Sequence, residues 1–344
     1  MAAGSCRLHD VSEQAGIGGQ SETTAPGMVA LRRLTLTDFR NYEHLMLHVD
    51  PVPVVLTGEN GAGKTNLLEA ISFFSPGRGL RRAALADCAR HGGAGGWAAA
   101  CEIERAAGPT RLGTGLAGDG EGMERQRKCR IDGQPVGSSG AFSEYLQIVW
   151  LTPSMDRLFT GPASDRRRFV DRLVGIVDHG HQRSTSRYER AMSERNRLLA
   201  LGSGETSWIE ALEAQMAEIG VALAASRLMA LGRLQGLIDD AGRDSAFPPA
   251  QLGITGTLEA ALADLPAVDV EDRFRGELKA ARGRDQAAGR ALSGPHRSDL
   301  ATHHAMTGAD AAHCSSGEQK ALLISVILAK ARLASEQHGG EAPV

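Results

Sequence analysis

The stretch Gly58-Glu-Asn-Gly-Ala-Gly-Lys-Thr65 decides how the rest of this sequence is interpreted. It fits the pattern G-x-x-x-x-G-K-[ST], whose glycines let consecutive backbone N–H groups turn toward one anion. The ammonium of Lys64 suits the outer phosphates of a nucleotide, and the hydroxyl of Thr65 can ligate Mg²⁺. The stretch therefore predicts a site for ATP and Mg²⁺ made of Gly58, Glu59, Asn60, Gly61, Ala62, Gly63, Lys64 and Thr65, in which Thr65 is the metal ligand.

The flanking residues favour a phosphate site over a simple glycine-rich turn. Pro53–Thr57 is a short apolar run without alternation, which predicts a strand buried on both faces. Residues 64–74 predict a helix that ends at Ser75-Pro76-Gly77. The motif requires a strand before the loop and a helix after it, and the sequence predicts both.

Composition limits the classes of protein to consider. The chain has 344 residues, 42% of them hydrophobic, which is enough for two domains or one large one. A net charge of −3 excludes a globally basic nucleic-acid binder but not a local basic face. Five scattered cysteines without a C-x-x-C pair favour a reducing cytoplasm. No run approaches 18 apolar residues, so we expect no membrane span.

The pattern along the chain predicts an α/β domain interrupted by helices. Short apolar runs at 29–39, 45–49 and 148–151 predict strands, and 97–136 predicts an antiparallel meander. A helical seam then recurs at spacings of three and four, with a return helix after a proline break; its positions are Ile209, Leu212, Met216, Ile219 and Leu223, then Val270, Phe274 and Leu278. We expect a disordered extension at 1–27, an ATPase head at 28–164 and 291–344, and a helical insertion at 165–290.

A second motif lies about 250 residues after the phosphate loop. Ser315, Ser316, Gly317 and Glu318 precede an apolar helix, and they resemble the signature loop of ABC-type ATPases. In that class the loop reaches across a head-to-head dimer to the γ-phosphate held by the other copy. An ordinary capped helix is the alternative interpretation of these four residues.

The spacing and several local segments resemble the RecF family. Leu36–Tyr42 resembles its "FRNY" strand, and Gly294–Leu300 resembles its "GPHR-x-D-L" turn. Thr152–Leu158 with Gly161–Asp171 resembles its "P-x-x-x-x-L…R-R-x-F-x-D" segment. The resemblance covers about residues 29–344 and implies a P-loop ABC-type head with a short helical arm. It also implies that Arg40, Asn41, Ser315, Ser316, Gly317 and Glu318 belong to the nucleotide site.

The family resemblance implies a function in DNA repair. RecF proteins are cytoplasmic bacterial ATPases that bind DNA at single-strand gaps and stalled replication forks, as part of the SOS-linked response. They form ATP-dependent homodimers and work with the proteins RecO and RecR to load the RecA recombinase. We therefore expect DNA, RecO, RecR and RecA as partners, and no membrane.

Two expected motifs do not appear in the sequence. The strand end near Ile148–Pro153 carries no convincing Q-loop glutamine, since Gln147 lies too early. No apolar strand ending in Asp-Glu, the Walker B motif of the family, follows the signature helix. That pair holds Mg²⁺ and orients water, so no catalytic residue is identified, and we expect a truncated family member that hydrolyses ATP poorly.

Arginines between 166 and 197 outnumber acidic residues and indicate where DNA could bind. Their helical spacing places Arg183, Arg187, Arg190 and Arg197 on one stripe, and arginines suit phosphate contacts. A solvated helix face with internal ion pairs is an equally weighted alternative, since Glu189 and Glu194 are close. For Arg166-Arg167-Arg168 the alternative is a structural network with Asp165 and Asp171.

Two other functions remain open. A small-molecule kinase or another P-loop NTPase would need an acceptor pocket and would show no dependence on DNA. A structural ABC-type head without gap repair would share the same nucleotide chemistry, and only the family motifs separate it from the first interpretation.

Overall fold

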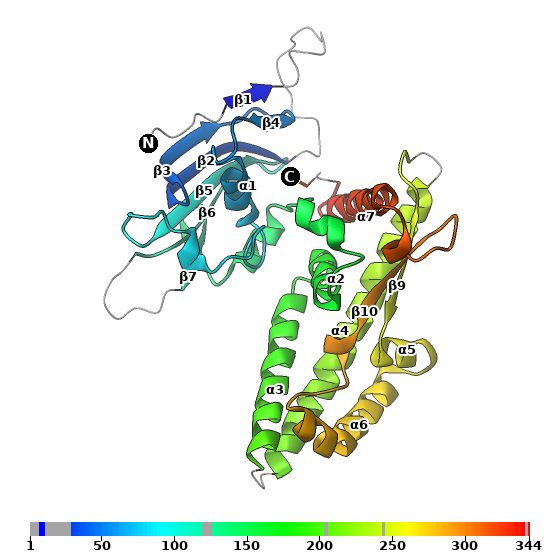
Figure 1. The fold of residues 1–344 in the computed structure, drawn as a ribbon. Helices are drawn as coiled ribbons and strands as arrows, with labels where there is room; N and C mark the ends of the chain where they lie inside the picture. The colour runs from blue at the N-terminus through cyan, green and yellow to red at the C-terminus, as the bar shows by residue number, and fades with distance from the viewer. Residues whose placement is uncertain (1–6, 11–28, 119–125, 203–205, 243–244, 341–342) are drawn as a thin grey trace. The chain divides into compact units, whose positions relative to one another are not determined.

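The computed structural model describes residues 7–10, 29–118, 126–202, 206–242, 245–340 and 343–344. Contacts between Cα atoms divide the chain into two compact units, residues 1–150 with 334–344, and residues 151–333. The boundaries expected at 164 and 290, from the change in composition and the helical pattern, stay a prediction. The observed units are cut at other residues. Figure 1 labels the helices and strands.

A six-stranded antiparallel sheet dominates the first unit, with strands in the order β3-β2-β5-β6-β7-β8. The predicted strand at 29–39 and the predicted meander are confirmed, and the pairing of β2 with β5 has a register shift between Leu31 and Arg33. The strand bounds are β2 Ala30–Phe39, β3 Tyr42–His48, β5 Trp97–Glu104, β6 Thr110–Leu116, β7 Arg127–Ile131 and β8 Gln134–Val136.

Helix α1, Lys64–Ser72, packs on one face of this sheet through an aromatic cluster. Phe39 on β2, Trp97 on β5 and Phe73 just after α1 have ring centroids 5.0–6.0 Å apart. Edge-to-face aromatic pairs add stability beyond the apolar area that they bury. The cluster therefore anchors the helix that follows the phosphate loop.

The strand before the phosphate loop is β4, Val54–Thr57, and its environment differs from the prediction. It pairs antiparallel with β1, Arg7–Asp10, so these four residues are ordered although residues 1–27 were expected to be disordered. The rest of that extension lies outside the described residues. Val54 and Val55 are 42% and 45% exposed, so the prediction of burial on both faces was wrong. In the described part of the chain β4 has β1 as its only strand partner, and of its apolar residues Leu56 is half-buried against the core of the first unit.

Residues 148–151 are not a strand, contrary to the prediction. The backbone there is extended beside Val344, whose carbonyl accepts from Val149 N–H at 3.0 Å and whose N–H donates to Gln147 O at 2.9 Å. Two hydrogen bonds to one residue do not make a ladder, which explains the difference.

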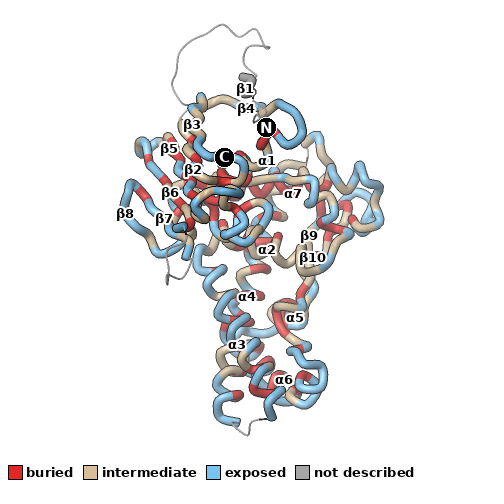
Figure 2. The backbone as a smooth tube through the Cα atoms, turned by 60° about the vertical axis from the view of Figure 1, so that its left-hand side comes forward, coloured by how far each residue is buried: buried red, intermediate tan, exposed pale blue. Residues whose placement is uncertain are grey.

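The second unit is mainly helical. Helices α3, α4 and α6 pack together as a helical arm whose buried positions face one another (Figure 2). The predicted seam and return helix are confirmed, because most of their residues pack with Tyr188 of α3 in one core, while Ile209 packs with Leu198 and Leu199 of α3. The seam helix runs on well past Leu223. The helix bounds are α2 Ala163–Val177, α3 His181–Leu201, α4 Thr206–Ala241, α5 Thr257–Asp264 and α6 Ala267–Ala288.

A two-stranded sheet, helix α7 and short 3₁₀ turns complete the fold. Strand β9, Ala250–Thr255, pairs antiparallel with β10, Asp299–His304, although α5 and α6 lie between them in the sequence, and this pairing was not predicted. Helix α7 extends from Ser316 to Gln337, and the 3₁₀ turns are η2 Leu85–Cys88, η3 Ser139–Glu144, η4 Pro153–Arg157, η5 Pro295–Arg297 and η6 Ala311–His313.

Helix α4 is long and apolar enough to cross a membrane by length and composition. Its contacts are those of a protein interior. Glu213 and Arg227 on this helix are buried and ion-paired to residues of other helices, and Met216 and Leu234 are fully buried. We therefore interpret α4 as the core helix of the arm.

Candidate functional site

The phosphate loop connects β4 to α1 in a conformation that only glycine adopts easily. Gly58, Gly61 and Gly63 have φ angles of 142°, 88° and 98°. Gly63 also lies against the β2–β3 turn, because an added Cβ would come within 2.4 Å of the Tyr42 hydroxyl and 2.7 Å of Asn41 Nδ2. Side chains at these positions would strain the backbone or collide. The motif glycines are thus required by geometry.

The first turn of α1 is left open to an anion. No side chain caps it and no acidic residue lies in it. The free N–H groups of a helix start and the positive end of its dipole together favour a phosphate. Lys64 Nζ lies over the loop and donates to Gly58 O at 2.6 Å and Glu59 O at 2.7 Å. The Thr65 side chain is exposed beside it. These features fit a nucleotide triphosphate.

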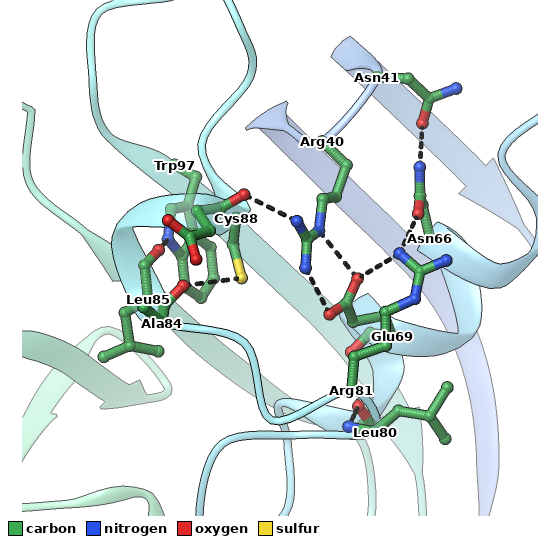
Figure 3. Close-up of polar contacts among 12 residues, drawn as sticks. Arg40, Asn41, Asn66, Glu69, Leu80, Arg81, Ala84, Leu85, Cys88 and Trp97 are labelled. Atoms are coloured by element: carbon green, nitrogen blue, oxygen red, sulfur yellow. Dashed lines mark hydrogen bonds and ion pairs between the residues drawn. The ribbon is translucent and has the colours of Figure 1, made fainter. Parts of the chain in front are cut away.

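A buried carboxylate on α1 organises the residues beside this loop (Figure 3). Glu69 is fully buried and accepts from Arg40 Nη2 at 2.7 Å and Nε at 2.9 Å, and from Arg81 Nη1 at 3.1 Å. Arg40 Nη1 also donates to Asp87 O at 2.7 Å. Arg40 thus braces the loop helix, and every nitrogen of its guanidinium is engaged within the protein.

The same network reaches Asn41. Asn66 Nδ2 donates to Asn41 Oδ1 at 2.8 Å, and Asn66 Oδ1 accepts from Arg81 at 2.8 Å. Asn41 therefore presents its amide nitrogen toward Gly63. The bracing role of Asn66, Glu69 and Arg81 was not predicted from the sequence. A glutamate at the fifth position after the motif lysine was the available signal.

The predicted signature loop lies in the second unit, between η6 and α7. The backbone N–H and hydroxyl of Ser315 donate to Glu318 Oε2 at 2.8 and 2.7 Å, and Ser315 Oγ accepts from Glu318 N–H at 3.3 Å. This reciprocal pair is a capping box. Gln319 Nε2 holds the preceding turn by donating to Cys314 O at 3.0 Å and Ala312 O at 3.2 Å. Ser316 and Gly317 are exposed at the start of the helix.

The arginine-rich segment at 166–168 is bonded within the protein. Of the two acidic partners in its alternative interpretation, Asp165 pairs with Arg168, whereas Asp171 pairs with His181 and Arg227. Arg166 makes a two-bond ion pair with Asp299, and Arg167 Nη1 donates to Ser298 O at 2.9 Å. The two family-like segments around 166 and 299 are therefore bonded to each other.

A second network joins the base of the arm. Asp171 accepts from His181 Nε2 at 2.9 Å and from Arg227 Nε at 2.9 Å, and Arg227 also donates to Pro295 O at 2.6 Å. Burial opposes the charge on Asp171, yet His181 and Arg227 hold its pKa below the usual value. His296 accepts or donates at Tyr188 Oη, 3.1 Å away, and burial lowers its pKa. These contacts support a junction rather than chemistry for His296.

The predicted arginine stripe on α3 divides into two parts. Arg183, Arg187 and Arg190 are exposed, and within the described residues they have no ion pair. Arg197 instead donates to Glu194 at 2.6 and 3.0 Å. Three of the four arginines predicted to contact DNA are thus exposed without a described ion-pair partner, and the fourth is ion-paired within α3.

Known proteins share this chain's sequence and fold. A family model described as an AAA domain matches residues 33–91. A DNA replication and repair protein RecF of Mesorhizobium japonicum is 51% identical over 91% of this chain and 82% of its own length. The RecF of Agrobacterium fabrum is 49% identical over 90% of this chain and 82% of its own length.

A solved structure of the recombination mediator protein RecF-ATPrS in the RecFOR pathway superimposes with a TM-score of 0.80. The superposition covers 93% of this chain and 85% of the RecF-ATPrS chain at 18% sequence identity, which shows a shared fold. A second, RecF-ATP, has the same TM-score at 19% identity. Given about 50% identity to named relatives over most of its length, this chain belongs to the RecF family of DNA replication and repair proteins.

Proposed function

We propose that this chain is an ATP-switched DNA-binding protein of gap repair, in which two copies close around two nucleotides. The observation that carries the proposal is the open start of α1, with Lys64 above a glycine loop, in a member of the RecF family. The RecF structures solved as ATP and ATPrS forms support nucleotide binding at this loop.

The residues of the loop divide the work of holding ATP. Backbone N–H groups from Gly61 to Thr65 would cradle the β-phosphate, and Lys64 would exchange its bonds to Gly58 O and Glu59 O for phosphate oxygens. The hydroxyl of Thr65 would hold Mg²⁺, which supplies charge neutralisation between the outer phosphates. Asn41, held by Asn66, has its amide nitrogen beside Gly63 and supplies a further donor.

Pairing of two copies would bring the signature loop of one to the nucleotide of the other. Ser316, Gly317 and the start of α7 are exposed and present N–H donors, as this role requires. Ser315→Arg would place a bulky cation where the partner's γ-phosphate must lie. Light scattering with ATP and Mg²⁺ should then find the variant monomeric, with unchanged nucleotide affinity. Normal ATP-dependent dimers of the variant would refute this assignment.

The DNA contact is assigned to Arg183, Arg187 and Arg190, because their charges are exposed and unpaired within the described residues. Arginines that reach only phosphates bind without reading sequence, which suits a protein that recognises gaps and junctions. Arg197 is left out, since Glu194 neutralises it.

In the cytoplasm, the bound complex would cooperate with RecO and RecR and promote loading of the RecA recombinase. The RecFOR pathway named for a structural neighbour and the names of the relatives support this placement. A pull-down on gapped DNA with ATP tests it: RecR should be retained by the wild-type chain and not by Lys64→Ala. Equal retention by both would separate partner binding from the nucleotide.

A further inference from the structure

In the proposed dimer, the N-terminus of α1 in one copy and the N-terminus of α7 in the other contact the same γ-phosphate. The two helix starts differ in their capping and charge. The start of α1 has no side-chain cap and no acidic residue. The start of α7 has both, because Glu318 lies in its first turn and is bonded to Ser315. The proposed nucleotide site thus combines one helix start open to anions with one that already carries a carboxylate.

Glu318 is charged and held in place. Hydrogen bonds from Ser315 lower its pKa first, and the nearby ring of His304 lowers it further. Its Oε2 accepts two hydrogen bonds, from the backbone N–H of Ser315 at 2.8 Å and from the hydroxyl at 2.7 Å. A full negative charge therefore stands one turn or less from Ser316 and Gly317, the donors assigned to the phosphate.

The surroundings do not cancel this charge. Asp310 caps η6 through its Oδ1, which accepts from Ala312 N–H at 2.8 Å. The signature-helix ammonium of Lys320 is 3.2 Å from Asp156 Oδ2 and so is already neutralised. Within the described residues no lysine or arginine is ion-paired to Glu318, and the His304 ring is the group that offsets part of its charge.

We infer that Glu318 opposes the approach of the partner copy's nucleotide, so that ATP-driven pairing is weak and readily reversed. The triphosphate of the partner copy's ATP would be repelled by the negative charge of Glu318. The Ser315 hydroxyl could donate to that phosphate only after its hydrogen bond to Glu318 is broken. Like charges a few ångströms apart repel even at a solvated surface. This inference rests on the proposed function and refines it, since Glu318 becomes a residue that limits dimer affinity instead of a phosphate ligand.

Glu318→Gln isolates the charge, because a capping box works with glutamine as well as with glutamate. The helix cap should survive, and thermal unfolding should stay at the wild-type midpoint. Repulsion is removed twice per dimer, so we expect ATP-dependent dimerisation to tighten by at least about fivefold. The gain should shrink at high salt, because surface charges are screened there.

Asp269→Asn is a matched control. Asp269 is an exposed carboxylate in the first turn of α6, in the same unit. Its neutralisation changes the net charge equally and should leave dimerisation unchanged. Ser315→Ala is a second variant, which breaks the box but keeps the Glu318 charge, and it should not tighten the dimer.

The measurement is sedimentation velocity of the full chain with ATP and Mg²⁺, with ADP and Mg²⁺, and without nucleotide. Tighter dimers of Glu318→Gln with ATP only would support the inference. Equal dimerisation of wild type and Glu318→Gln, or an equal gain in Asp269→Asn, would overturn it and leave the proposed function standing. If neither wild type nor Glu318→Gln dimerises with ATP, the pairing itself is overturned, and the inference with it.

Discussion

Arg166 and Asp299, 133 residues apart, form an ion pair in which Nε donates to Oδ1 and Nη2 donates to Oδ2, both at 2.7 Å. Arg166 Nη1 also donates to Gly161 O at 2.6 Å. Side-by-side bonding fixes the guanidinium in one orientation, so this pair connects α2 to the start of β10 with a defined geometry. Two segments that resemble family motifs are therefore explained by structure instead of by ligand binding.

Removal of either partner should destabilise the second unit. We expect Arg166→Ala and Asp299→Ala each to lower the free energy of unfolding by about 1–3 kcal/mol, because each leaves a partly buried charge without its partner. The double variant should cost clearly less than the sum of the two. Urea unfolding of all four proteins measures this coupling, and strictly additive losses would show that the pair contributes no interaction energy.

Loss of the motif lysine should abolish tight nucleotide binding. Among the described residues, the side-chain hydrogen bonds of Lys64 go to two loop carbonyls, so Lys64→Ala should leave the unfolding midpoint nearly unchanged. ATP affinity should fall by about a hundredfold or more, since the charge-assisted bonds to phosphate are lost. Lys128→Ala, which removes the same charge from an exposed position on β7, is the control and should bind normally in equilibrium titrations. Wild-type affinity in Lys64→Ala would place the nucleotide elsewhere.

Charge reversal on α3 tests the DNA surface. Arg187→Glu with Arg190→Glu should weaken binding similarly for all DNA sequences and reduce the salt slope by about one unit per lost phosphate contact. The control reverses Arg273 and Arg275 on α6, whose guanidiniums are paired to Glu277 and Asp272. Both variants change the net charge equally. An equal effect of the two would mean that only net charge matters, and the stripe would be an ordinary solvated face.

Lys330 should make stability depend on pH. Burial and, to a smaller extent, the charge of Arg172 together lower the pKa of this α7 lysine to about 7. An unfolded lysine has a pKa near 10.4, so folding disfavours its charged form. Stability should therefore fall as the pH decreases from about 10 toward 7, with the full penalty present below 7.

Lys330→Met would remove that penalty while keeping the length of the side chain. We expect about 1–4 kcal/mol of added stability at pH 7 and a much smaller gain near pH 10. Contact with the Phe169 ring, 5.8 Å from Nζ, offsets part of the penalty in the wild type. Thermal unfolding across this range checks the slope, and a destabilised variant at pH 7 would show that the charge is well accommodated.

Local patterns predicted the parts of the fold that depend on local chemistry. The glycines of the phosphate loop, the seam of α4 and the strands of the meander follow from spacing alone, and the structure confirms them. The failures depend on distant partners. Val54 and Val55 lie in an apolar run, but burial requires neighbouring elements that a window of sequence does not show.

The same division holds at the candidate site. The lysine, the glycines and the capping serine can be recognised from their spacing. Spacing does not show whether an arginine is free or ion-paired, because the partner can be near or far in the sequence. Arg197 pairs with Glu194, three residues away, but Arg40 pairs with Glu69, 29 residues away. Arginine assignments in such a chain therefore depend on the structure.

The most direct test of an ATP-switched DNA clamp is DNA affinity as a function of nucleotide. Fluorescence anisotropy with duplex, single-strand and gapped substrates should be recorded with ATP and Mg²⁺, with ADP and Mg²⁺, and without nucleotide, for wild type and Lys64→Ala. Wild type should bind DNA more tightly with ATP than with ADP or without nucleotide, and most tightly on gapped DNA. The DNA affinity of Lys64→Ala should be the same in all three conditions. The same affinity in all three nucleotide conditions for the wild type would contradict it.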